Sequence, residues 1–183
     1  MGKVVRKPWE LHPTIWKTES AFLSYIRGGI RRHLWAKSPI KLEFIKRARR
    51  RIKNPVAANL KRFPEVWGGQ CEICKKDFAL KDMEVDHKTG EHSLRTVADI
   101  QAFVEGIVFV TYEDLALLCK SCHKAKTHAE RTGMSLDDAI IAKQAIAIQK
   151  GNDKLWLAEK GIVPAGNAKQ RKEQIIAVLK ENL

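Results

Sequence analysis

The sequence predicts an α+β protein, mostly helical, whose small core is held together by a bound metal. Two Cys-x-x-Cys pairs are the first observation, because two residues between thiols form a tight knuckle whose sulfurs converge on one ion. The second is the spacing of apolar residues, which recur at helical intervals on both sides of these pairs. The third is size: 183 residues, 44% of them hydrophobic, leave room for one compact core and one or two appendages.

The two pairs use all four cysteines of the chain, and they are Cys71 with Cys74 and Cys119 with Cys122. Four thiolates at this spacing predict a tetrahedral structural zinc site. They also fit a reducing compartment better than disulfides would. A thioredoxin-like redox role is disfavoured, because two pairs are present and no strand–helix–strand pattern surrounds either of them.

A carboxylate and two imidazoles accompany the cysteines. Asp86 and His87 lie between the two pairs, and His123 follows the last cysteine directly. A zinc ion would gather these groups into one small volume, yet a structural site does not need them. We therefore hypothesise that these groups surround a second, catalytic metal ion. Because consecutive strand residues point to opposite faces, the strand must end or bend after His87, and residues 88–90 can supply that bend.

The residue types suit metal-assisted hydrolysis of a phosphodiester. His87 titrates near neutral pH, so its neutral form can accept a proton from water. Asp86 stays anionic and suits a hard cation. A mixed set of carboxylate and imidazole ligands would leave positions for water and phosphate oxygens, and it accepts Mg²⁺, Mn²⁺ or another transition ion such as Ni²⁺. The sequence does not choose among these ions.

Residues 71–127 resemble the HNH endonuclease family, in the variant whose core contains four cysteines. The resemblance rests on three pieces in order: a Cys-x-x-Cys pair, a strand ending in Val85-Asp86-His87, and the run from Asp114 to the second pair, His123 and the residues after it. It implies a ββα-metal fold, in which a β-hairpin and a helix surround a divalent ion, and it implies cleavage of DNA by nicking or double-strand hydrolysis. Small stand-alone proteins of this type are frequent in phage genomes.

The resemblance also implies residue roles. By position, His87 is the general base, and Asp86 and His123 are ligands of the catalytic ion. The family often has Asn where Asp114 stands here. Asp114 is therefore expected either to orient His87 or to add a second carboxylate to the metal. The alternative to a nuclease is a non-catalytic zinc-ribbon protein that binds DNA, in which Asp86-His87 is only a surface dipeptide.

The positive charge is concentrated in the first part of the chain. Residues 1–70 contain 17 basic and 4 acidic residues, whereas residues 71–183 contain 17 of each, so the net +13 lies in the first 70 residues. Such density predicts salt-dependent binding to DNA. Aromatic residues are interleaved with the basic ones, so we expect the segment to fold. The candidate DNA-binding residues are Arg31, Arg32, Lys46, Arg47, Arg49, Arg50, Arg51, Lys53, Lys126 and His128.

The predicted organisation has three parts. Residues 1–66 form a basic helical DNA-clamping region, residues 67–132 the HNH core with its zinc, and residues 133–183 a helical extension. In the first part we expect a short helix over 21–26 ended by Gly28-Gly29, and a second helix from Ser38-Pro39 through 52.

Further helices and one returning strand are expected in the rest of the chain. In the core, a helix over 97–105 precedes a returning strand over 107–110. A helix that begins at about His123 runs through about 131 with Gly133 as its cap, and a helix follows over 135–149. The last stretch, 154–183, reads as helix, loop, helix and resembles the SAP and helix–extended-loop–helix DNA-binding modules. An ordinary helical hairpin is equally compatible with it.

The sequence predicts a cytoplasmic protein, in the cytoplasm of the bacterial host if it is phage-encoded. No apolar run reaches the roughly 18 residues of a membrane span, and the N-terminus lacks the apolar stretch of a signal peptide. DNA is the predicted partner. A homodimer is left open, and no protein partner is identified. His92 is expected to be a solvated loop residue.

Overall fold

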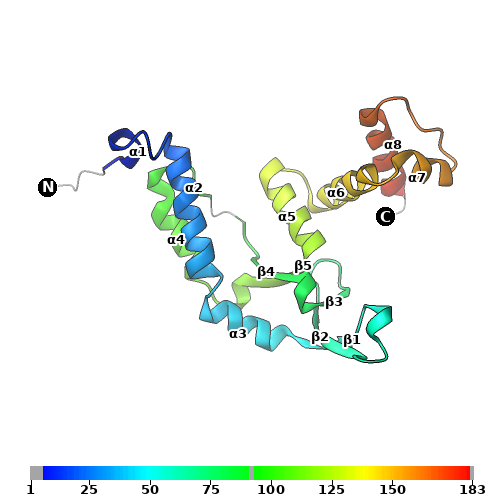
Figure 1. The fold of residues 1–183 in the computed structure, drawn as a ribbon, viewed down its shortest axis with the longest axis horizontal. Coiled ribbons are helices and arrows are strands. Elements are labelled where there is room, and N and C mark those ends of the chain that lie inside the picture. The colour runs from blue at the N-terminus through cyan, green and yellow to red at the C-terminus, as the bar shows by residue number, and fades with distance from the viewer. Residues whose placement is uncertain (1–5, 91–92, 182–183) are drawn as a thin grey trace. The chain divides into compact units, whose positions relative to one another are not determined.

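The fold combines helices with two small sheets (Figure 1). A computed structural model describes residues 6–90 and 93–181, so that His92 lies outside the described residues. The chain divides into two compact units, Met1–Leu118 and Cys119–Leu183. The predicted α+β class with mostly helical content is confirmed.

The first unit begins with two helices, α1 (Pro8–Leu11) and α2 (Glu19–Gly29), and α2 continues into a π-helical turn, Ile30–Trp35. The expected turn at Gly28-Gly29 is therefore wrong. Glycine in a helix costs only about 1 kcal/mol relative to alanine. Packing of the apolar face outweighs that cost, since Leu23 is buried and Ile26, Ile30 and Trp35 pack against the same cluster.

Helix α3 (Pro39–Ala48) begins as predicted, with the Ser38 hydroxyl accepting from the backbone N–H of Lys41 at 3.4 Å. It does not reach residue 52. Arg49 has extended backbone angles, and Arg50–Lys53 forms strand β1. Strand pairing overrides the helical spacing here, because Ile52 is buried opposite Val66 of the partner strand.

Strand β1 belongs to an antiparallel sheet with β2 (Glu65–Gln70) and β3 (Asp77–Ala79), in the order β1-β2-β3. Strand β2 leads directly into the first cysteine pair. Gly68 allows the close packing, because a Cβ atom there would lie 2.3 Å from Cδ1 of Ile52 and 2.5 Å from the carbonyl oxygen of Phe78. The sheet ends beside the first cysteine pair.

A second sheet pairs β4 (Met83–His87) with β5 (Leu115–Cys119). Helix α4 (Ile100–Val108) lies between these strands in the sequence, as expected for the helix predicted over 97–105. The returning strand predicted over 107–110 is wrong. Ile107 and Val108 belong to α4, where Ile107 is buried in one cluster with Phe103 and Val108 packs against it.

The core of the first unit joins its N-terminal helices to α4. One buried cluster contains Leu23 of α2, Leu94 of the segment between β4 and α4, and Phe103 and Ile107 of α4. Figure 1 shows α2 and α4 running alongside each other. The basic N-terminal segment is therefore packed into this unit, as its aromatic content predicted.

The second unit is helical and matches the predicted pattern. It contains α5 (Lys120–Thr132), α6 (Leu136–Lys150), α7 (Asp153–Glu159) and α8 (Ala168–Glu181). Gly133 ends α5 with a left-handed φ of 71°, and the hydroxyl of Ser135 caps α6 by accepting from the N–H of Asp138. Buried Ala145, Leu157 and Ile175 join the last three helices.

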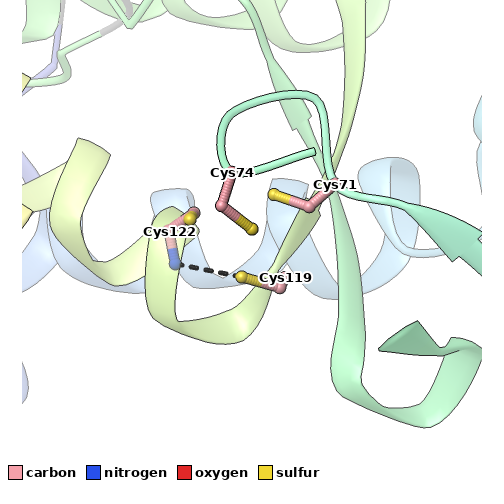
Figure 2. Close-up of side chains that lie close together, drawn as sticks. All are labelled: Cys71, Cys74, Cys119 and Cys122. Atoms are coloured by element: carbon pink, nitrogen blue, oxygen red, sulfur yellow. Dashed lines mark hydrogen bonds between the residues drawn. The ribbon is translucent and has the colours of Figure 1, made fainter. Parts of the chain in front are cut away.

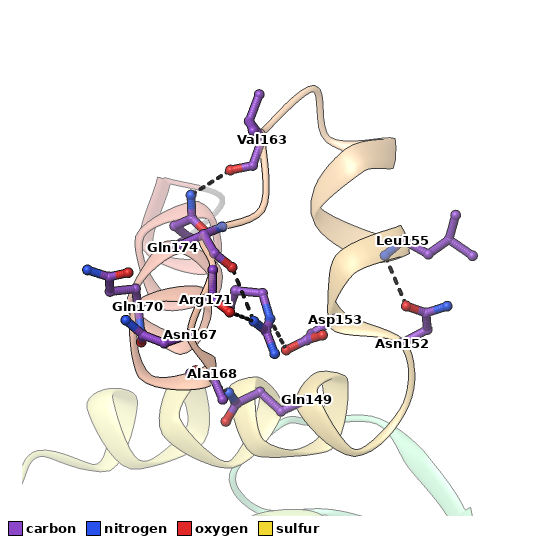
Figure 3. Close-up of polar contacts among 12 residues, drawn as sticks. Gln149, Asn152, Asp153, Leu155, Val163, Asn167, Ala168, Gln170, Arg171 and Gln174 are labelled. Carbon is purple, nitrogen blue, oxygen red and sulfur yellow. Dashed lines mark hydrogen bonds and ion pairs between the residues drawn. The ribbon is translucent and has the colours of Figure 1, made fainter.

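The loop between α7 and α8 is fixed by polar side chains (Figure 3). Arg171 donates from Nη1 to the carbonyl oxygens of Ala165 and Gly166 at 3.1 and 3.0 Å, and from Nε to Asp153 at 2.8 Å. Gln174 contacts the loop as well, accepting from the N–H of Ala165 at 3.0 Å. Across residues 6–90 and 93–181, no helix combines the length and apolar character needed to cross a membrane.

Candidate metal centre

The four cysteines lie together (Figure 2). Their sulfur atoms are all within 4.8 Å of one another, and Cys71, Cys119 and Cys122 are buried. In a tetrahedral zinc site with Zn–S bonds of about 2.3 Å, the sulfurs are about 3.8 Å apart, so a contraction of about 1 Å closes the site. Four soft thiolates select zinc over magnesium or calcium. The predicted cysteine cluster is confirmed as a set of residues that could hold a metal such as zinc.

The first cysteine pair lies in a tight turn after β2. The backbone N–H of Cys71 donates to the carbonyl of Lys76, and the N–H of Lys75 donates back to the carbonyl of Cys71, both at 2.9 Å. Lys75 has a left-handed φ of 58°, which lets the chain reverse within a few residues. This reversal directs both thiols of the pair to the same side.

The second pair lies at the start of α5. The Cys119 side chain caps the helix, since its sulfur accepts from the backbone N–H of Cys122 at 3.4 Å. Ser121 lies 3.3 Å from the same sulfur. This cap holds the Cys119 sulfur at the start of the helix, beside Cys122.

His87 is the last residue of β4 and is buried, with 8% of its surface exposed. Its Nε2 lies 3.3 Å from the carbonyl oxygen of Ile107. A carbonyl only accepts hydrogen bonds, so Nε2 must carry the proton in this contact. A neutral His87 then has its lone pair on Nδ1, which is the atom able to accept a proton from water.

Trp35 lies against His87, and Lys41 lies against Trp35. The ring centroid of Trp35 is 4.3 Å from that of the imidazole, and Nζ of Lys41 lies 4.8 Å from the Trp35 ring. Burial lowers the pKa of Lys41, an effect that the nearby carboxylate of Glu84 opposes. The histidine is thus held between a backbone carbonyl and an indole, two contacts that the sequence did not predict.

Asp114 precedes β5 and caps the turn before it. Its Oδ2 accepts from the N–H and the hydroxyl of Thr111, at 2.7 and 2.9 Å. These hydrogen bonds lower the pKa of the Asp114 carboxyl, and the charges of His87 and Lys88 lower it further. Its own carbonyl accepts from the N–H of Lys88 at 2.8 Å. Asp114 therefore holds the segment that follows His87.

The predicted ligands of the catalytic metal are found on regular elements. Asp86 is half-buried in β4, and His123 is half-buried in α5. Among the described residues, the four cysteines are the only set of three or more histidine, cysteine or acidic side chains close enough to share an ion. The site of Asp86, His87 and His123 therefore stays a prediction.

Several predicted DNA-binding residues already have partners. Lys46 and Arg47 both pair with Glu43, Arg50 pairs with Asp77 at 2.5 Å, and Lys126 pairs with Glu130 at 2.6 Å. Arg31, Arg32 and Lys53 are exposed.

His128 differs from these basic residues. Burial lowers its pKa first, and the charges of Lys143, Arg131 and Lys172 lower it further. Its Nδ1 is buried without a hydrogen-bond partner among the described residues. Below this lowered pKa it would gain the positive charge that a phosphate contact uses, but at neutral pH it is uncharged.

No protein-family model, curated protein or solved structure matches the chain. Its function must therefore be inferred from its own residues. Those residues comprise a cysteine cluster suited to a metal, a buried histidine whose Nε2 faces a backbone carbonyl, and a strongly basic N-terminal segment.

Proposed function

We propose that the chain is a metal-dependent HNH-type endonuclease that hydrolyses DNA phosphodiester bonds. His87 carries the proposal. A general base for water needs a lone pair on a fixed atom, and the contact between Nε2 and the carbonyl of Ile107 leaves that lone pair on Nδ1. His87 follows the carboxylate of Asp86, and the N–H of Lys88 after it donates to the carbonyl of Asp114.

The order of elements supports the same proposal. Strands β4 and β5 pair, and β5 leads directly into α5, which is the ββα order that the resemblance implies. His87 ends the first strand, Asp114 precedes the second, and His123 lies in the fourth position of the helix. The cysteine pairs flank this segment, so a zinc ion there would hold the strands and the helix start together.

The proposed roles follow from these positions. Asp86 and His123 would hold a divalent ion such as Mg²⁺, Mn²⁺ or Ni²⁺, which supplies stabilisation of the charge that develops on the leaving oxygen. His87 accepts the proton of the attacking water at Nδ1. Trp35 and the Ile107 carbonyl hold the imidazole, and basic residues of the N-terminal segment bind the phosphates.

Plasmid cleavage tests the proposal. The purified chain should nick or cut supercoiled DNA with Mg²⁺, Mn²⁺ or Ni²⁺. This cleavage should stop when EDTA is added. His87→Asn, which keeps the side-chain volume closer than alanine does, should lower the rate by about 10²- to 10⁴-fold with zinc content and DNA affinity unchanged. His33→Ala, at an exposed histidine, is the control and should cleave normally.

The outcome also separates the two candidate functions. Cleavage by His87→Asn within a few-fold of the wild-type rate removes His87 from the mechanism. DNA binding with zinc present and no cleavage with any of the three ions would favour the zinc-ribbon binding protein instead.

A further inference from the structure

Aromatic and arginine side chains form a surface patch on the hairpin of β1 and β2. Trp67 and Phe63 are 43% and 52% exposed, which is high for such large apolar side chains. The guanidinium groups of Arg49 and Arg51 each lie 4.4 Å from the Trp67 ring centroid, and that of Arg62 lies 5.1 Å from the Phe63 ring. These five residues are called the Trp67 patch below.

The strand register explains which arginines reach Trp67. Arg51 is directly opposite Trp67 in the antiparallel pair, so the two side chains share one face of the sheet. Arg49 precedes Arg51 by two residues and lies on that face as well. Arg50 points to the opposite face, where it pairs with Asp77 at 2.5 Å. Residues 49–51 thus present two arginines to an exposed indole and one to a carboxylate.

A pocket of about 320 Å³ adjoins the patch. Its walls include Asn54, Val56, Phe63, Val66, Trp67 and Leu80. The amide of Asn54 is already used, because it donates to the carbonyl of Phe63 at 2.9 Å and accepts from the N–H of Val56 at 3.0 Å. The remaining walls are largely apolar, and the volume is at the lower end of the range for ligand sites. Such a site suits a flat ring.

We infer that the Trp67 patch binds single-stranded nucleic acid, with an unpaired base stacked on Trp67 and the arginines bound to neighbouring phosphates. Base stacking on an aromatic ring is stronger than an exposed contact between a cation and the same ring, so a base can displace a guanidinium group from the indole. The displaced arginine keeps its charge and its hydrogen-bond donors for phosphate oxygens.

The positive charge of the Trp67 patch favours single-stranded nucleic acid over other ligands. A proline-rich peptide also docks on exposed aromatic rings, but it would leave three guanidinium groups without a charged partner. A regular duplex supplies phosphates, but its bases are stacked on one another and cannot reach an indole. Unpaired nucleic acid supplies both the anionic backbone and the open base face.

The inference deepens the proposed function in one respect, since it names DNA with unpaired bases as the form of the substrate. The inference concerns binding only and does not depend on cleavage. Binding is therefore measured with the full-length chain and a fluorescently labelled oligo(dT) of about 20 nucleotides, with no divalent ion added. Each variant is first checked for an unchanged melting temperature.

Trp67→Leu should weaken oligo(dT) binding by about tenfold, within the range that one stacked base supplies. Trp67→Phe, which keeps an aromatic face, should stay within about threefold of wild type. Arg49→Ala with Arg51→Ala should lower the slope of log affinity against log salt by about 1.4, the value for two phosphate contacts to a single strand. Lys150→Ala removes an exposed charge at the end of α6, and Phe109→Leu removes an exposed ring elsewhere. Both should bind as wild type does.

The inference is overturned if Trp67→Leu binds oligo(dT) as tightly as wild type, or if the leucine and phenylalanine variants lose equal affinity. A loss of affinity in Trp67→Leu that is as large for a duplex or a proline-rich peptide as for oligo(dT) would overturn it too. Plasmid cleavage by the same variants keeps the two proposals apart. If the wild type cleaves plasmid but Trp67→Leu binds oligo(dT) normally, only the nuclease is supported. If Trp67→Leu loses oligo(dT) affinity but no protein cleaves, only the single-strand site is supported.

Discussion

The indole of Trp35 lies against the imidazole of His87, with ring centroids 4.3 Å apart and planes inclined by 33°. The two residues come from different elements, a π-helical turn and the end of a strand. Together with the carbonyl of Ile107 at Nε2, the indole restricts how the imidazole can turn. The N-terminal helices therefore help to orient the proposed catalytic imidazole, in addition to supplying positive charge.

Trp35→Leu should lower kcat by about tenfold or more with little change in KM, because an imidazole free to turn spends less time in the productive orientation. Trp35→Phe should restore most of the rate, since a ring can still stack. Plasmid cleavage over a range of DNA concentrations measures both constants. Equal loss in the leucine and phenylalanine variants, or a change confined to KM, would assign Trp35 to packing or to DNA binding instead.

Asp114 and Asp99 form a matched pair for testing the electrostatics near His87. Each carboxylate closes a capping box with a threonine three residues earlier, and these hydrogen bonds lower the pKa of each. Only Asp114 is also affected by the charge of His87. Its stabilising contribution is present above the ordinary carboxyl value of 3.8 and is lost as the pH falls through its lower, folded-state pKa.

Asp114→Asn should move the acidic limb of the pH–rate profile to lower pH, because the carboxylate favours the charged form of His87, which cannot act as a base. Asp99→Asn should leave the profile unchanged. The same Asp114 variant tests the second expected role, since a lost metal ligand would raise the ion concentration needed for half-maximal rate. A profile and a metal dependence both equal to wild type would exclude both roles.

The cysteine cluster and the helices of the second unit could be predicted because their signals are local. Two residues between thiols define a knuckle, and Gly133 and Ser135 mark a helix end and a helix start within three residues. Nothing in these patterns depends on a distant partner.

Elements that depend on long-range pairing were predicted less well. Residues 50–53 continue the apolar spacing of α3, but Ile52 gains burial against β2 and the segment becomes a strand. Residues 107–110 have the composition of a strand, yet Ile107 is needed by the cluster around Phe103. The contacts of His87 with Trp35 and Ile107 had no sequence signal, because both partners come from other elements.

Loss of one cysteine should release the metal. Cys71→Ser or Cys119→Ser should lose about one equivalent of zinc and lower the melting temperature, since metal binding supplies folding free energy. Lys75→Gly is the control within the same knuckle, because glycine readily adopts the φ of 58° found there. It should keep its zinc. Metal analysis and thermal melting check these outcomes, and a wild-type chain without zinc whose melting is unaffected by a strong chelator would contradict them.

Exposed basic residues of the N-terminal segment are expected to bind duplex DNA. Deleting the segment would be uninformative, because Leu23 and Ile52 are buried in the core of the first unit. Point variants avoid this problem. Arg31 and Arg32 are exposed on the π-helical turn, whereas Lys126 has only 15% of its side chain exposed and pairs with Glu130.

Replacing Arg31 and Arg32 together by alanine should weaken duplex binding and lower the slope of log affinity against log salt by about 1.8, the value for two lost phosphate contacts. Lys126→Ala should change the slope little, because its charge is already balanced by Glu130. Titrations at several salt concentrations give both slopes. If Lys126→Ala lowers the slope and the arginine variant does not, then DNA contacts the start of α5, and the charge of the N-terminal segment serves another partner.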